Sequence, residues 1–157
     1  MKKSILTLAF CLGFAVAGMA QQVHERLYTA VTSGDVKTAS QLLREKADPN
    51  AAVSSGPWMK VSLLTLAVLK NNNEMARLLI KHKADVNQKD GFNTSPLMYA
   101  AAQGNKELVL LLLKNGADVQ ANDGNNNSVL TAALESNNPE IVALVEEKIK
   151  TRQKQPK

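Results

Sequence analysis

The segment DGFNTSPLMYAAAQGNKELVLLLLKNGADVQAN (Asp90–Asn122) decides the fold, because its landmarks return along the chain at a spacing of 33 residues. The tripeptide Ala-Asp-Val at 84–86 recurs at 117–119. Three other landmarks keep the same spacing: a leucine (Leu64, Leu97, Leu130), an asparagine or glycine (Asn71, Gly104, Asn137) and a glutamate (Glu74, Glu107, Glu140). Since separate landmarks share one period, the chain is predicted to be an array of repeated structural units.

Each unit holds two short apolar stretches separated by a glycine or an asparagine, residues that tolerate the left-handed conformation at a helix end. Ser95 and Pro96 predict a helix start, since the serine can cap the helix and proline suits its first position. Pro139 is predicted to open the last helix in the same way. Helices this short cannot bury their apolar faces as isolated pairs, so neighbouring pairs must stack.

The period and the residues that keep it resemble the ankyrin repeat, with its pattern D-x-x-G-x-T-P-L-H-x-A-A-x-x-G-x-x-E, an apolar helix and then G-A-D-V-N. The best copy matches at Asp90, at Ser95-Pro96-Leu97, at Gly104 and at Glu107. The resemblance implies an all-α ankyrin-repeat solenoid of four helix-pair repeats with short hairpin fingers. It covers nearly the whole domain expected at residues 21–150, with repeats at about 23–50, 57–89, 90–122 and 123–150.

The second repeat departs from the pattern at Leu63, where proline is usual, and at Lys83, and the connection before it is longer. Lys83 stands where glycine is usual, and a lysine in the left-handed region costs about 1 kcal/mol or more. We therefore expect this repeat to be the least stable inner one. The connection from Asp48 to Leu63 spans fifteen residues, against eleven from Asp85 to Pro96, which predicts a lengthened finger of the kind that commonly carries function.

The two end repeats are expected to close the array with polar outer faces, as a finished solenoid needs. The second helix of the first repeat carries Lys37 and Thr38 where inner copies are more apolar. Glu146 and Glu147 replace the last apolar pair of the final repeat.

Residues 1–20 have the layout of a secretory signal peptide, with Lys2 and Lys3 at the start, an apolar run, and small residues ending at Ala20. We expect cleavage after Ala20 and a periplasmic or secreted mature protein of a bacterium. An uncleaved membrane anchor is the alternative, although the apolar run is shorter than the roughly 20 residues that span a bilayer. Cys11, the only cysteine, leaves with the signal, so the mature chain has no disulfide and no thiol nucleophile.

The positive charge of the chain is concentrated at its two ends. The formal net charge of +5 falls to +3 when Lys2 and Lys3 leave, and five of the remaining positive residues lie between Lys148 and Lys157. Residues 21–147 then carry 12 basic and 14 acidic groups, which is not the footprint of a nucleic-acid-binding groove. The basic tail, 151–157 with the lysines before it, either contacts an anionic membrane or polymer, or is the solvated end of a helix.

Nothing in the sequence indicates catalysis. It contains no G-x-S-x-G, P-loop or dinucleotide fingerprint, and its two histidines, His24 and His82, lie far apart. We interpret Glu74, Glu107 and Glu140 as helix-start residues that satisfy backbone N–H groups and the helix dipole. A non-enzymatic protein without cofactor or metal is therefore expected. An enzyme, the rival interpretation, would need a convergent polar pocket.

Aromatic residues are rare, and two of them fall on adjacent predicted fingers. The ankyrin pattern places Trp58 and Phe92 at partner-contacting positions, with Met59 beside them. Exposed aromatic side chains commonly dominate the energetics of interfaces. The alternative is that Trp58 or Phe92 is buried and fills the long loop, whereas Tyr28 and Tyr99 are expected to pack on first helices.

The resemblance implies a monomer that recognises another protein, such as an envelope enzyme that it inhibits, protects or assists. The alternative function is a stress-resistance factor held on an anionic surface by the tail. The expected partner-binding surface combines fingers and first-helix ends, carried over from the ankyrin pattern: Trp58, Met59, Val61, Phe92, Thr94, Asn125 and Asn127 on the fingers, and Leu69, Lys70, Ala102, Gln103, Glu135 and Ser136 on the first helices.

Overall fold

The computed structural model describes residues 21–54 and 60–154. The predicted signal peptide and two of the predicted site residues, Trp58 and Met59, lie outside the described residues. The chain divides into two compact units, one ending at Asp48 and the other beginning at Pro49.

The first unit is a helix pair. A helix at residues 21–33 is followed by Gly34 with a φ of 76° and by α2 (Val36–Arg44). Asp35 caps α2, because its carboxylate accepts a hydrogen bond from the backbone N–H of Thr38 at 3.0 Å. Leu27, Val31 and Leu42 are among the buried residues of this pair.

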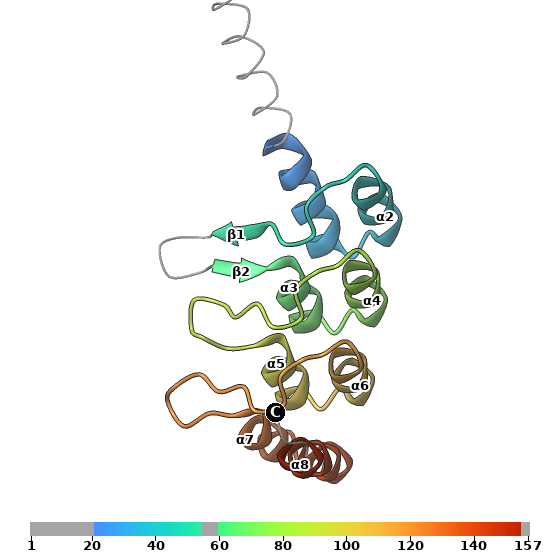
Figure 1. Cartoon of the computed structure of the whole chain (residues 1–157). Helices are drawn as coiled ribbons and strands as arrows, with labels where there is room; N and C mark the ends of the chain where they lie inside the picture. Colours follow the sequence, from blue (N-terminus) through green and yellow to red (C-terminus); the bar gives the residue numbers. More distant parts are fainter. Residues whose placement is uncertain (1–20, 55–59, 155–157) are drawn as a thin grey trace, which may run out of the picture. The chain divides into compact units, whose positions relative to one another are not determined.

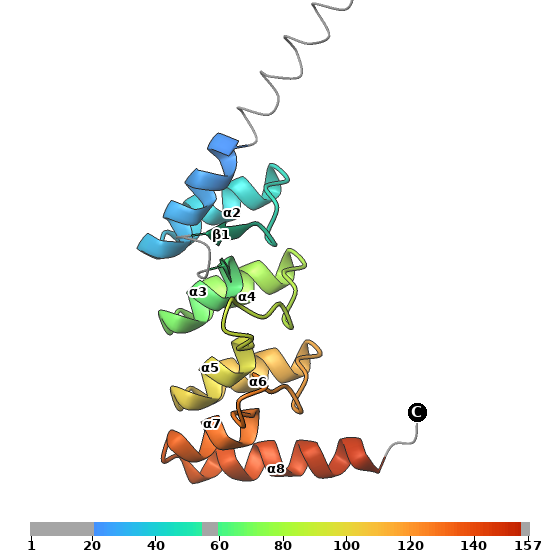
Figure 2. The same ribbon diagram turned by 90° about the vertical axis from the view of Figure 1, so that its left-hand side faces the viewer.

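The second unit stacks three helix pairs, so the described residues form four pairs in all, as expected. Its first helices form one row and its second helices a parallel row (Figures 1 and 2). The expected all-α ankyrin-repeat architecture is therefore confirmed. The first helices are α3 (Leu63–Leu69), α5 (Pro96–Ala102) and α7 (Val129–Glu135), and the second helices are α4 (Asn73–Lys81), α6 (Lys106–Lys114) and α8 (Pro139–Gln153).

The lengthened connection before α3 contains a small β-hairpin. Strands β1 (Ala52–Ser54) and β2 (Lys60–Ser62) pair antiparallel, with Val53 opposite Val61. The two strands lie before α3, on the same side of the first helices as the later fingers (Figure 1).

Serine and asparagine caps define the helix starts at the 33-residue period. Ser62, Ser95 and Ser128 cap the first helices, which confirms the predicted role of Ser95. The second helices are capped by Asn72, Asn105 and Asn138.

The predicted role of the repeated glutamates was wrong in part. Glu107 and Glu140 lie in the first turns of their helices, where the dipole favours them, but asparagines satisfy the backbone N–H groups. The glutamate side chains instead reach the preceding repeat. Arg77 donates to Glu107 at 2.8 Å and Lys106 donates to Glu140 at 2.8 Å.

Burial of the second helices confirms the sequence register. Leu112 is 0 % exposed, whereas Leu110, at the position that is usually polar, is 44 % exposed. The expected polar outer face of the last repeat was wrong in part. Leu134 in α7 is 56 % exposed, although its equivalents Val68 and Ala101 are both fully buried.

Lys83 adopts the predicted left-handed conformation, with a φ of 71°. Replacing it with glycine removes a strain of about 1–2 kcal/mol but also makes the unfolded chain more flexible. We therefore expect Lys83→Gly to raise the free energy of unfolding by about 0.5–1 kcal/mol, measured by urea denaturation.

The reciprocal control is Gly116→Ala, one period further along the chain. Gly116 has a φ of 89°, and an added Cβ meets no atom within 4 Å, so any loss comes from backbone strain. This variant should lose about 1 kcal/mol. A destabilised Lys83→Gly protein would contradict the expected strain.

Candidate protein-interaction surface

The finger between α4 and α5 is a fixed turn built around Asp90. One carboxylate oxygen of Asp90 accepts hydrogen bonds from the backbone N–H groups of Phe92 and Thr94, both at 2.9 Å. The Asp90 N–H donates to the carbonyl of Thr94 at 3.0 Å, and Asn93 takes a φ of 61°. The turn leaves the Phe92 side chain 60 % exposed, so Phe92 does not fill a loop interior.

Tyr99 ties this finger to helix α5. Its hydroxyl donates to the second carboxylate oxygen of Asp90 at 2.6 Å. Burial, followed by the hydrogen bond to Asp90, raises the pKa of Tyr99 to about 12, so the hydroxyl stays protonated at neutral pH. Sequence reasoning gave Tyr99 a packing role and missed this bond, although the position of Asp90 in the repeat pattern was visible.

The finger between α6 and α7 repeats the arrangement around Asp123. Its carboxylate accepts from the N–H groups of Asn125 at 2.7 Å and Asn127 at 3.2 Å, and from the Asn127 side-chain amide at 2.8 Å. These bonds, led by the one from Asn125, lower the pKa of Asp123. Both asparagines are exposed, but the side-chain amide of Asn127 is already hydrogen-bonded to Asp123 within the turn.

Hydrogen bonds connect each finger of the second unit to the next. The Gly91 N–H donates to the carbonyl of Lys60 at 3.0 Å. Further along, Asn93 donates its side-chain amide to the carbonyl of Asp123 at 3.0 Å, and Lys89 donates to the carbonyl of Asn122 at 2.6 Å. The fingers therefore form one continuous, braced edge rather than separate loops.

The predicted first-helix residues fall into two columns at the C-terminal ends of α3, α5 and α7. One column is Leu69, Ala102 and Glu135, and all three are exposed. The other is Lys70, Gln103 and Ser136. Lys70 and Gln103 are exposed, whereas Ser136 is half-buried and donates to the carbonyl of Ala133 at 2.7 Å.

The structure thus distributes the described residues of the predicted surface over two parts of the second unit, the fingers and the first-helix ends. Gln103 connects repeats by donating to the carbonyl of Leu69 at 3.1 Å. Across the two columns, the exposed residues change from the cation Lys70 at α3 through neutral Gln103 at α5 to the anion Glu135 at α7. Val61 and Thr94 are half-buried at the base of the fingers and offer less surface than predicted.

Part of the predicted basic tail is folded against the repeats. Helix α8 continues to Gln153, and Arg152 forms an ion pair with Asp118 at 2.6 Å. Lys150 lies 3.9 Å from Glu146. Within residues 21–54 and 60–154, no helix is both long enough and apolar enough to cross a membrane.

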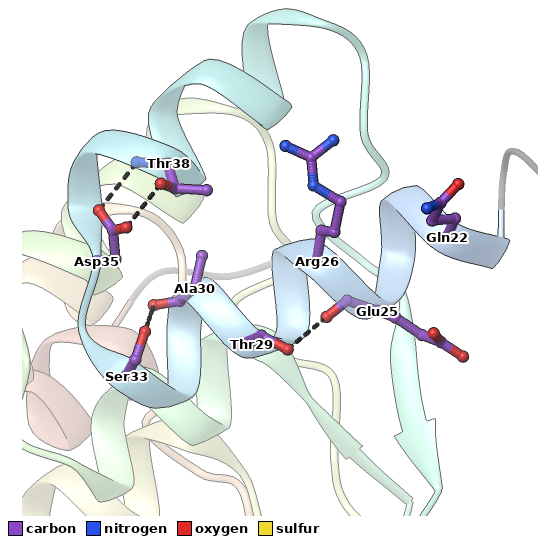
Figure 3. Close-up of a pocket in the computed structure, with 8 residues that line it drawn as sticks. All are labelled: Gln22, Glu25, Arg26, Thr29, Ala30, Ser33, Asp35 and Thr38. Carbon is purple, nitrogen blue, oxygen red and sulfur yellow. Dashed lines mark hydrogen bonds between the residues drawn. The ribbon is translucent and has the colours of Figure 1, made fainter.

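The hollow in the first unit, drawn in Figure 3, is lined by residues of the helix at 21–33 and of the start of α2. Thr29 and Ser33 donate their hydroxyls to backbone carbonyls of their own helix, those of Glu25 and Ala30. Hydrogen bonds from Thr38 lower the pKa of Asp35, whereas a general acid needs a raised value. The described residues also contain no group of three or more His, Cys, Asp or Glu side chains that could hold a metal ion.

Comparison with known proteins identifies the repeat family. The family model for ankyrin repeats in three copies matches residues 27–123 and also residues 64–155. The search of curated proteins found no match. Ankyrin repeats are protein–protein interaction modules and are typically not catalytic. With more than half of its length matched and the helix-pair stack in place, this chain belongs to the ankyrin-repeat family.

Proposed function

We propose that this protein is a non-catalytic recognition protein of the bacterial envelope, which binds another protein through its fingers and first-helix ends. The observation that carries the proposal is Phe92, a large aromatic side chain that is 60 % exposed on a turn fixed by Asp90. The exposed C-terminal ends of α3, α5 and α7 are the second part of the binding face that the ankyrin pattern implies.

The rigidity of this surface favours tight binding. Association costs less conformational entropy when the contacting groups are already ordered. The Asp90 turn, its bond to Tyr99 and the bridges between fingers hold Phe92 in place before a partner arrives. Lys70, Gln103 and Glu135 at the first-helix ends are exposed and offer polar contacts to the same partner.

The proposed partner is an envelope enzyme that this protein inhibits, protects or assists. The signal-like residues 1–20 support the location in the envelope. The rival use of the tail on an anionic surface is less favoured, because Arg152 is engaged by Asp118 within the chain.

Export predicts a mature protein that begins at Gln21. Signal peptidase cleaves after small residues such as those that end at Ala20. Intact mass and N-terminal sequencing of the protein from periplasmic extract and culture medium will measure this. An envelope form that retains Met1 would contradict the proposed cleavage.

Replacing either of two exposed alanines with arginine tests the binding face. Ala102 is exposed at the end of α5, on the proposed face, and Ala143 is exposed on α8, away from it. A long charged side chain at position 102 should prevent close contact. Ala102→Arg should therefore lower the affinity for the partner recovered from envelope extract by at least about tenfold. The affinity is measured by titration.

The Ala143→Arg variant controls for the added charge. It should bind as the wild type does, and circular dichroism should show both variants folded. Equal affinities for Ala102→Arg and wild type would contradict the proposed face, and equal losses in both variants would show a nonspecific charge effect.

A further inference from the structure

A groove of about 460 Å³ lies between α6 and the C-terminal part of α8, away from the fingers. Its apolar lining comes from α6 and the turn after it: Leu110, Leu113, Ala117 and Val119. The opposite wall is formed by Lys148, Thr151 and Arg152 of α8, and Lys114 completes the rim. Neither the fingers nor the first-helix ends contribute a residue to it.

The groove exists because α8 is longer than the other second helices. It has 15 residues, whereas α4 and α6 have 9 each, and Figure 2 shows it running on past the end of α6. The ion pair between Arg152 and Asp118, at 2.6 Å, holds this extension beside the turn that follows α6. The extension therefore forms one wall of the groove in the structure.

Leu110 makes the groove unlike the surface of the neighbouring repeats. The equivalent residues one period before and after it are Arg77 and Ala143, and all three are exposed. Leu110 is 44 % exposed, so the chain places a large apolar side chain where packing within the chain does not require one. Such a residue in a concave site is typical of contact with another molecule.

The charges around the groove are all of one sign. No acidic side chain lines it. Among the described residues, neither Lys114 nor Lys148 forms an ion pair, whereas Arg152 is neutralised by Asp118. Two uncompensated cations beside an apolar floor are complementary to a ligand that is both acidic and apolar.

We propose that this groove binds an acidic segment of a partner protein, with one apolar side chain seated on Leu110 and Leu113 and carboxylates facing Lys114 and Lys148. A bilayer is a poorer fit, because the apolar residues lie in a hollow that a flat surface does not enter. A nucleic-acid strand is also a poorer fit, because no aromatic side chain lines the groove for base stacking. This second site is independent of the finger surface.

The test is a selection from a displayed library of random short peptides against the mature protein, followed by fluorescence anisotropy with the enriched peptides. The groove should enrich peptides that combine Asp or Glu with a large apolar residue. Their affinity should fall at least about tenfold with Leu110→Asp, and likewise with Lys114→Glu combined with Lys148→Glu. Added salt should weaken binding.

Matched controls separate the groove from general charge effects. Ala143→Asp places the same acid at the equivalent position of α8, and Lys81→Glu with Lys154→Glu makes the same change in net charge on exposed residues outside the groove. Both controls and Phe92→Ala should bind the peptides as the wild type does. If Phe92→Ala does not bind the peptides, the peptides bind the finger surface, and the proposed groove site is contradicted.

Three other outcomes would overturn the proposal. They are enrichment of no peptide or of peptides without acidic residues, undiminished binding by both groove variants, and phosphatidylglycerol vesicles that bind through Leu110 while the peptides do not. If Leu110→Asp fails to fold, the double lysine variant decides the result, because both lysines are exposed.

Discussion

Replacing Leu112 with alanine is expected to lower the free energy of unfolding by about 2–5 kcal/mol. Leu112 is 0 % exposed and lies with the equally buried Leu108 and Val109 on the inner face of α6. The loss combines the transfer of the missing methyl groups with the cavity left behind, and the stacked repeats on both sides limit any collapse. Urea denaturation followed by circular dichroism measures it.

Leu110→Ala is the matched control on the same helix. Because Leu110 is 44 % exposed, its truncation should change the free energy of unfolding by no more than about 1 kcal/mol. Similar losses at both positions would contradict the register in which α6 packs. The same control also reports whether the groove beside α8 is needed for folding.

Removing both predicted finger aromatics, Trp58→Ala with Phe92→Ala, is expected to leave the fold intact and abolish partner binding. Truncation of an interface tryptophan commonly costs 2 kcal/mol or more, which corresponds to at least about thirty-fold in affinity. Phe92 is 60 % exposed, so its removal leaves no cavity in the core. Circular dichroism and thermal melting test the fold, and titration against the partner recovered from envelope extract tests binding.

Single variants divide this effect between the two residues, since Trp58 lies outside the described residues. Phe92→Ala alone should weaken binding, and Asn125→Ala, at the equivalent position of the next finger, should have a smaller effect. An unfolded double variant with a folded Phe92→Ala protein would favour the alternative in which Trp58 fills the long finger. If the double variant is folded and binds with unchanged affinity, the partner is recognised by the first-helix ends around Lys70, Gln103 and Glu135 and not by the finger aromatics.

The features that could be predicted from the sequence depend only on residues close together within one repeat. Ser95 and Pro96 specify a helix start through their own backbone chemistry, and Lys83 occupies a position where the chain must turn. Leu112 and Leu110 differ in burial because of their places on one helix face. Each of these follows from spacing within a single repeat.

The features that were missed depend on contacts between repeats. Glu107 lies in a helix start as predicted, but its side chain is bound by Arg77, thirty residues earlier, because stacking brings the two helices together. Leu134 is exposed because no described repeat covers the position at which Val68 and Ala101 are buried. The ion pair between Arg152 and Asp118 could not be foreseen, because it requires α8 to continue where α6 ends.

The central claim is that the fingers and first-helix ends form the partner-binding face, and hydrogen–deuterium exchange tests it most directly. The mature protein is compared alone and in complex with the partner from envelope extract. Binding is predicted to slow exchange at residues 90–94 and at 101–105 more than within 106–114 of α6, because contact with the partner suppresses the local opening that exposes these hydrogen-bonded amides. Unchanged exchange at 90–94 and 101–105 in a saturated complex would contradict the account.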